Sequence, residues 1–152
     1  MKKMREAYST LEQAVKHAEG NWKIWSNLLS VSLSLKQFYK FIECIERLVR
    51  LEHSELLTKQ TMSKIQQVMK FKLYEALDGK IRKRIAFNFK NRIDRLFGYL
   101  ETAIGQNPIV WEAKTSYLEV VLEYEVEMYR YYYNLHKEGK IDPNDLLDGF
   151  ET

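Results

Sequence analysis

Apolar side chains recur at intervals of three and four residues along almost the whole chain of 152 residues. In the segment 37–52, Phe38, Phe41, Ile42 and Ile45 would share one face of a helix, and the segment 82–105 steps from Ile85 by fours. No segment shows the strict polar–apolar alternation of a half-buried strand. The pattern therefore predicts an all-α protein.

Glycine, asparagine and proline divide this periodic sequence into separate helices. Gly20 ends the first, Gly79 the fourth and Gly139 the last, and Pro108 suits a first helical position. We expect six helices, at about 4–19, 22–34, 37–52, 55–77, 82–105 and 109–137. Residues 1–139 would form one helical domain. Residues 140–152 would form an acidic tail, in which Asp142 and Pro143 can begin one short helical turn.

The helices also repeat a larger pattern, in which a Trp and a Leu three residues later open one hairpin and spaced small residues follow in its second helix. Trp25 and Leu28 fit the first helix, and the same phase recurs 86 residues later at Trp111. The residues expected to define the repeat core are Ala7, Leu11, Ala14, Trp25, Leu28, Ile93, Phe97 and Trp111. This spacing predicts a tetratricopeptide-like, right-handed stack of helical hairpins. An unrelated helical bundle or half-tetratricopeptide array is the alternative.

The first helix matches the second half of a hairpin whose first half is absent. We therefore expect an uncovered apolar edge near Ala7, Leu11 and Ala14, through which the chain could associate with itself. The same observation indicates that the chain is a fragment of a longer array.

Several short motifs occur in a specific order. They are Trp22, Ile24, Trp25 and Asn27, then Arg47, Leu48 and Leu51, and later Leu96-Phe97-Gly98, Asn107 and Val110-Trp111. In this order they resemble the C-terminal repeats of the tetratricopeptide repeat protein 27 family, well over 7–53 and moderately over 93–113, with a departure from Lys114 onward. The resemblance implies a eukaryotic, non-catalytic scaffold or assembly factor, linked to large complexes such as spliceosomal ribonucleoprotein.

Charge is distributed unevenly along the chain. Residues 55–100 carry eleven Lys and Arg against four Asp and Glu, whereas residues 101–152 carry four against eleven. The basic patch consists of Lys80, Arg82, Lys83, Arg84, Lys90, Arg92 and Arg95. With Phe87 nearby, such a patch can bind single-stranded nucleic acid, which makes an RNA-processing helical-repeat protein the alternative function. It can equally contact an acidic protein partner, the chain's own glutamates at 119–127, or water.

Two further surfaces are candidates for a protein partner. Lys23, Asn27 and Ser30 would line the inner groove of the repeat, where Lys and Asn clamp the acidic tails of chaperones in some tetratricopeptide domains; a solvated surface is the plainer interpretation. The last helix is rich in tyrosine, and Tyr124, Tyr131, Tyr132 and Tyr133 are predicted to form an aromatic face for a partner or for a missing segment. Partial burial within the domain is the alternative.

Nothing in the sequence indicates catalysis. The three histidines have no ligand spacing, and the one cysteine, Cys44, lacks a nearby activating histidine. We therefore expect a protein that is not an enzyme, with no cofactor, no metal and no small-molecule substrate. No apolar run is long enough for a membrane span. The cysteine usage favours an intracellular setting, in the cytoplasm or the nucleus.

Overall fold

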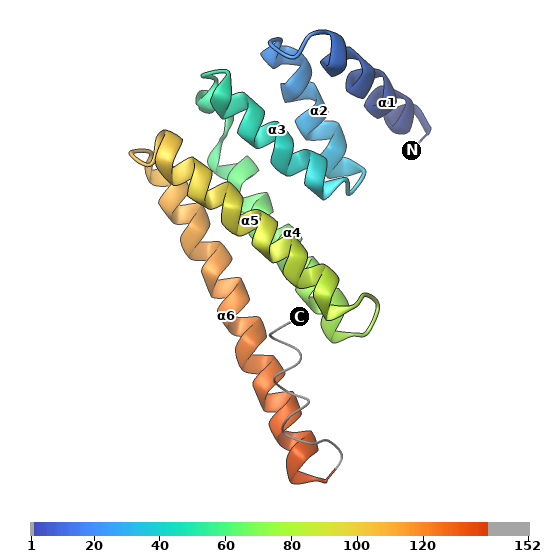
Figure 1. Ribbon diagram of the computed structural model, residues 1–152, viewed down its shortest axis with the longest axis vertical. Helices are drawn as coiled ribbons and strands as arrows, with labels where there is room; N and C mark the ends of the chain where they lie inside the picture. The colour runs from blue at the N-terminus through green and yellow to red at the C-terminus, as the bar shows by residue number, and fades with distance from the viewer. Residues whose placement is uncertain (1, 140–152) are drawn as a thin grey trace. The chain divides into compact units, whose positions relative to one another are not determined.

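Helices account for most of the described chain. The computed structural model describes residues 2–139, and within them it contains six α-helices, one 3₁₀ helix and no strand (Figure 1). They are α1 (Lys2–His17), α2 (Trp22–Ser34), α3 (Phe38–Arg50), η1 (Ser54–Leu56), α4 (Lys59–Leu77), α5 (Lys83–Ile104) and α6 (Pro108–Lys137). The all-α prediction and the number of helices are confirmed. The predicted acidic tail at 140–152, with its short helical turn, lies outside the described residues.

Local capping explains where several of the helices begin. Asn21 and Asn107 accept hydrogen bonds from the backbone amides of Lys23 and Ile109, both at 3.0 Å, and thereby cap α2 and α6. The predicted start of the fourth helix at residue 55 is wrong. Residues 54–56 form η1, and α4 begins only after Thr58, whose hydroxyl accepts from the amide of Thr61 at 3.1 Å.

Three helices end in the same hydrogen-bonded turn, in which an amide donates to a carbonyl five residues earlier. The donor and acceptor pairs are Gln37 with Ser32, His53 with Leu48, and Lys80 with Glu75, at 2.8, 2.9 and 2.9 Å. The residue in the left-handed conformation is Gly79 after α4 (φ 79°), but Lys36 after α2 (φ 59°) and Glu52 after α3 (φ 63°). A side chain at these last two positions is unfavourable, because the left-handed region suits glycine.

The helices belong to two compact units. Among the described residues, one unit contains 2–61 together with 96–110, and the other contains 62–95 together with 111–139. Helices α4, α5 and α6 each contribute to both units. Each unit is therefore assembled from two separate stretches of sequence.

In the first unit, α1 packs on α2 and α2 packs on α3, with successive helices running in opposite directions (Figure 1). Trp25 is only 2% exposed and Leu28 is fully buried, as expected for repeat-core positions. The indole Nε1–H of Trp25 donates a 2.8 Å hydrogen bond to the Glu19 carbonyl oxygen. This bond connects the buried ring to the turn between α1 and α2.

The start of α1 corrects part of the predicted repeat core. Residues from Lys2 to Ala7 are all exposed, so Ala7 is not a core residue. Leu11 and Ala14 are half-buried, and only Val15 is fully buried on this helix. The expected apolar edge is therefore reduced to Ala7 and the outer parts of Leu11 and Ala14.

In the second unit, α4, α5 and the greater part of α6 supply the core. The fully buried side chains include Ile65, Met69, Leu73, Ala86, Phe89, Ile93, Tyr117 and Met128. Ile93 is buried as predicted, and so is Phe97 in the first unit. Ile85, which was expected to point inward, is 47% exposed, because Ala86 takes the inward position three residues before Phe89.

Trp111 is the largest discrepancy in the predicted core. It is 52% exposed, whereas Val110, Ala113 and Tyr117 around it are buried. Since one helical residue corresponds to a rotation of about 100°, the neighbours of Trp111 point inward and Trp111 does not. The sequence equivalence of Trp111 with Trp25 thus does not extend to burial.

Candidate interaction surfaces

The predicted groove residues lie on α2. Lys23, Asn27 and Ser30 are all exposed, and their spacing of four and three residues places them on one side of the helix. The Lys23 ammonium lies 5.8 Å from the centroid of the Trp22 ring. The structure therefore brings the three residues together on an open helix surface.

Lys83 is the most constrained member of the basic patch. Its ammonium lies over the Tyr132 ring, 4.2 Å from the centroid, and donates a hydrogen bond to the Tyr132 hydroxyl. Burial lowers the pKa of Lys83, because it penalises the charged form. The contact joins the start of α5 to α6 in the second unit and removes Lys83 from the freely accessible surface.

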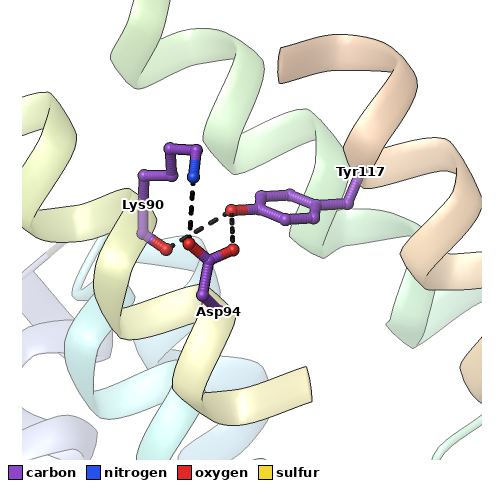
Figure 2. A network of polar contacts seen from close by, with 3 residues as sticks. All are labelled: Lys90, Asp94 and Tyr117. Atoms are coloured by element: carbon purple, nitrogen blue, oxygen red, sulfur yellow. Dashed lines mark hydrogen bonds and ion pairs between the residues drawn. The ribbon is translucent and has the colours of Figure 1, made fainter. Parts of the chain in front are cut away.

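Lys90 is also engaged by its neighbours. Its ammonium lies 3.0 Å from Asp94, one turn further along α5 (Figure 2). The Tyr117 hydroxyl, reaching from α6, donates to the other carboxylate oxygen of Asp94 at 2.6 Å and also lies 3.3 Å from the Lys90 carbonyl oxygen. Burial raises the pKa of Tyr117, and the hydrogen bond to Asp94 raises it further. Lys90 therefore belongs to a structural network between α5 and α6.

The remaining basic residues are more accessible. Arg84 and Arg95 are exposed on one face of the N-terminal part of α5, with Asn88 and Asn91 exposed between them. Lys80 and Arg82 are exposed in the segment before α5, and Arg92 is half-buried. The basic patch is thus a row of exposed arginines and asparagines rather than a continuous cluster of seven cations.

The tyrosines do not form the single face that was predicted. Tyr124 is 1% exposed and belongs to the core, since its spacing from Tyr117, Val121 and Met128 places all four on the buried side of α6. Tyr132 is half-buried against Lys83, whereas Tyr131 and Tyr133 are exposed. The inclusion of Tyr124 in an exposed aromatic face is wrong.

A second apolar surface on α6 was missed at the sequence level. We call it the outer stripe, and it consists of Trp111, Leu118, Leu122, Val126, Tyr129 and Tyr133, each at least 40% exposed. At about 100° per residue, these positions fall within an arc of about 80° around the helix axis. The centre of this arc is rotated by roughly 120° from the buried side of the helix. Their spacing by three, four and seven residues was a readable signal.

Charged side chains border the outer stripe along one flank. Glu112, Glu119 and Glu123 are exposed there in the first half of α6, and Arg130 and Lys137 are exposed on the same flank in the second half. On the opposite flank, Glu125 is half-buried near the middle. An apolar stripe with ordered charges beside it is typical of a helix that packs against another helix.

Residues 2–139 contain neither a candidate membrane span nor a candidate metal site. No helix in this range is both long enough and apolar enough to span a lipid bilayer. Nor does the range contain a group of three or more His, Cys, Asp or Glu side chains positioned to hold a metal ion.

No protein-family model matches the chain, and no curated protein or solved structure matches it either. The resemblance to the tetratricopeptide repeat protein 27 family therefore stays a prediction that depends on the residues quoted for it.

Proposed function

We propose that this chain is a non-catalytic protein-interaction module of tetratricopeptide type and that α6 carries its principal contact surface. One observation supports this most directly: α6 is apolar on two sides, and the outer stripe remains exposed after the other side is buried in the second unit. Exposed apolar residues that are contiguous along one helix mark interaction sites more often than scattered ones do.

The first unit supports the tetratricopeptide assignment. Trp25 and Leu28 are buried in α2, as the repeat pattern requires, and Phe41, Ile45 and Leu48 are buried in α3 at the same spacing as Ala7, Leu11 and Ala14, although they are larger than the residues of the pattern. The turns between α1, α2 and α3 are short, and the helices alternate in direction. Helices α5 and α6, with 22 and 30 residues, are longer than those of a 34-residue unit. We therefore propose the right-handed repeat stack for α1 to α3.

By its resemblance, the chain would act as an intracellular scaffold or assembly factor for a large complex, such as a spliceosomal ribonucleoprotein, in the cytoplasm or nucleus. The exposed residues Lys23, Asn27 and Ser30 offer a second, polar contact surface on α2. The Trp22 ring, whose centroid lies 5.8 Å from the Lys23 ammonium, gives the Lys23 end of this surface an apolar component.

The proposal is tested by affinity purification of the tagged chain from a eukaryotic extract, with and without nuclease, followed by mass spectrometry. The double variant Leu118→Ser/Leu122→Ser is compared with the wild type, since both leucines are exposed and their replacement leaves the core intact. We expect partners that survive nuclease and are lost from this variant. The variant Ile85→Ser, which removes an exposed apolar residue from α5, is the matched control and should keep them.

Partners that bind both variants equally would overturn the assignment of the contact surface to α6. Partners that disappear after nuclease treatment would favour the second candidate function, RNA binding through the basic segment 80–95. The observation in its favour is the exposed row of Arg84, Asn88, Asn91 and Arg95 on α5. RNA binding should weaken steeply with salt and should be reduced in Arg84→Glu/Arg95→Glu. Binding of a protein partner to apolar side chains should show neither effect.

A further inference from the structure

The part of the outer stripe from Leu118 to Tyr133 is nearly symmetric about its midpoint, which lies between Glu125 and Val126, and Trp111 lies outside this part. Leu118 and Tyr133 lie equally far from this point, and so do Leu122 and Tyr129. If a second α6 were laid antiparallel across the first, each leucine would oppose a tyrosine of the partner. A spacing that is unchanged by reversal is what a two-fold symmetric contact requires.

The exposed charges beside the stripe change sign about the same midpoint, from Glu119 and Glu123 before it to Arg130 and Lys137 after it. A two-fold axis across an antiparallel helix pair brings equivalent flanks together. Arg130 would then lie opposite residue 121 of the other copy, within one turn of its Glu119 and Glu123. A parallel arrangement would instead place the glutamate-rich first halves of both helices side by side, where like charges repel. The charge pattern therefore favours the antiparallel arrangement.

We propose that the outer stripe between Leu118 and Tyr133 binds a second copy of this chain, forming an antiparallel, two-fold symmetric pair of α6 helices. This inference rests on the proposed function and names the partner of that surface. The contact would run for about 22 Å along the helix and would cover roughly 500 Å² per copy, about 1,000 Å² in total, which is near the lower limit for a specific interface and below the area of an obligate homodimer.

One residue opposes the pairing. Glu125 lies on the other flank, next to the midpoint, so the two copies would bring their Glu125 carboxylates close together. The pair is therefore expected to form reversibly. The variant Glu125→Gln should strengthen it, because it removes the like charge and preserves the shape.

The first experiment measures the mass of the full chain by light scattering after gel filtration, over a series of concentrations. We expect a concentration-dependent rise toward twice the chain mass of 18.2 kDa. Leu118→Glu/Leu122→Glu should remain monomeric, and Ile85→Glu should behave as the wild type. Circular dichroism shows whether each variant is folded. A wild type that stays monomeric at its highest soluble concentration would overturn the proposal, as would a dimer that the leucine variant leaves intact.

The second experiment determines the direction of the helices by disulfide trapping. In the antiparallel pair, Val126→Cys lies next to its equivalent and should cross-link with itself, whereas Leu118→Cys should cross-link with Tyr133→Cys on another chain and not with itself. Equal self-cross-linking of Leu118→Cys would overturn the antiparallel arrangement. The native Cys44 is fully buried and does not compete.

Charge exchange provides an independent check. Arg130→Glu and Glu119→Arg/Glu123→Arg should each weaken self-association, and mixing the two variants should restore it as a heterodimer. The mass measurement and the extract experiment together separate this inference from the proposed function. Suppose that the chain is monomeric and that Leu118→Ser/Leu122→Ser still loses partners from the extract. The outer stripe is then a contact surface for another protein and does not bind a second copy of this chain.

Discussion

The Tyr117 hydroxyl on α6 donates a 2.6 Å hydrogen bond to the Asp94 carboxylate on α5, and the Tyr117 side chain is fully buried. Tyr117→Phe removes this bond and keeps the ring, while Asp94 retains Lys90 as a partner. We expect the free energy of unfolding in urea to fall by about 1.5–3 kcal/mol, the usual range for a hydrogen bond to a charged group. The exposed Tyr133→Phe serves as the control and should change it by less than about 0.5 kcal/mol. If Tyr117→Phe has the same free energy of unfolding as the wild type, the hydrogen bond to Asp94 contributes nothing to stability.

The same tyrosine should make the protein sensitive to alkali. Burial and Asp94 raise the pKa of Tyr117, whereas in the unfolded chain a tyrosine ionises near pH 10. The native state therefore holds the proton that the unfolded state releases, so the stabilisation is complete below about pH 10 and decreases as the pH rises above it. Urea titrations from pH 8 to pH 12 should give a steeper decline for the wild type than for Tyr117→Phe. If stability falls equally with pH in the two proteins, the raised pKa of Tyr117 does not contribute to the loss.

Cys44 on α3 should be chemically inert in the folded protein. It is fully buried, and burial, aided by Glu43, raises the pKa of its thiol to about 12. Since the thiolate is the reactive form, we expect Ellman's reagent at pH 8 to react only in denaturant, where one thiol per chain becomes available. The exposed variant Ser30→Cys should react at once and provides the comparison. Rapid reaction of native Cys44 would indicate local opening of α3.

Trp25 and Trp111 should respond differently to the same substitution, although the repeat pattern pairs them. Trp25→Phe loses a buried ring and the 2.8 Å bond to the Glu19 carbonyl, so we expect a loss of about 2 kcal/mol or more. Trp111→Phe acts at a largely exposed position and should change stability by less than about 0.5 kcal/mol. Urea unfolding measures both. Equal losses would mean that the two positions are equivalent after all.

Two helix ends offer stabilising substitutions. Lys36 and Glu52 adopt the left-handed conformation, with φ of 59° and 63°, in turns where Gly79 occupies the corresponding position after α4. Lys36→Gly and Glu52→Gly should each stabilise the protein by about 0.5–1 kcal/mol, and Gly79→Ala should destabilise it by about 1 kcal/mol. Thermal unfolding of the three variants shows whether each substitution raises or lowers the stability. A loss of stability in both glycine variants would show that the entropy of the unfolded chain dominates.

The helices could be predicted well because their boundaries are set by local chemistry. Gly79, Asn21 and Pro108 act within a few residues, and the structure uses all three at helix ends. The orientation of α6 was harder to predict, because this helix carries two apolar sides and a single stripe does not identify the inner one. Tyr124 was therefore expected outside, and Trp111 inside. Ile85 was placed inward for a similar reason, since the small side chain of Ala86 gives a weak signal.

The division of the chain into interleaved units also affects how the protein is made. The first unit includes residues 96–110, yet the ribosome must synthesise residues 62–95, which belong to the other unit, before that stretch emerges. During synthesis, on the order of seconds, α1, α2 and α3 exist without the rest of their unit. A stop codon between 61 and 96 would leave neither unit whole. Truncation and domain-swap experiments on this chain therefore have no boundary at which one unit can be separated from the other.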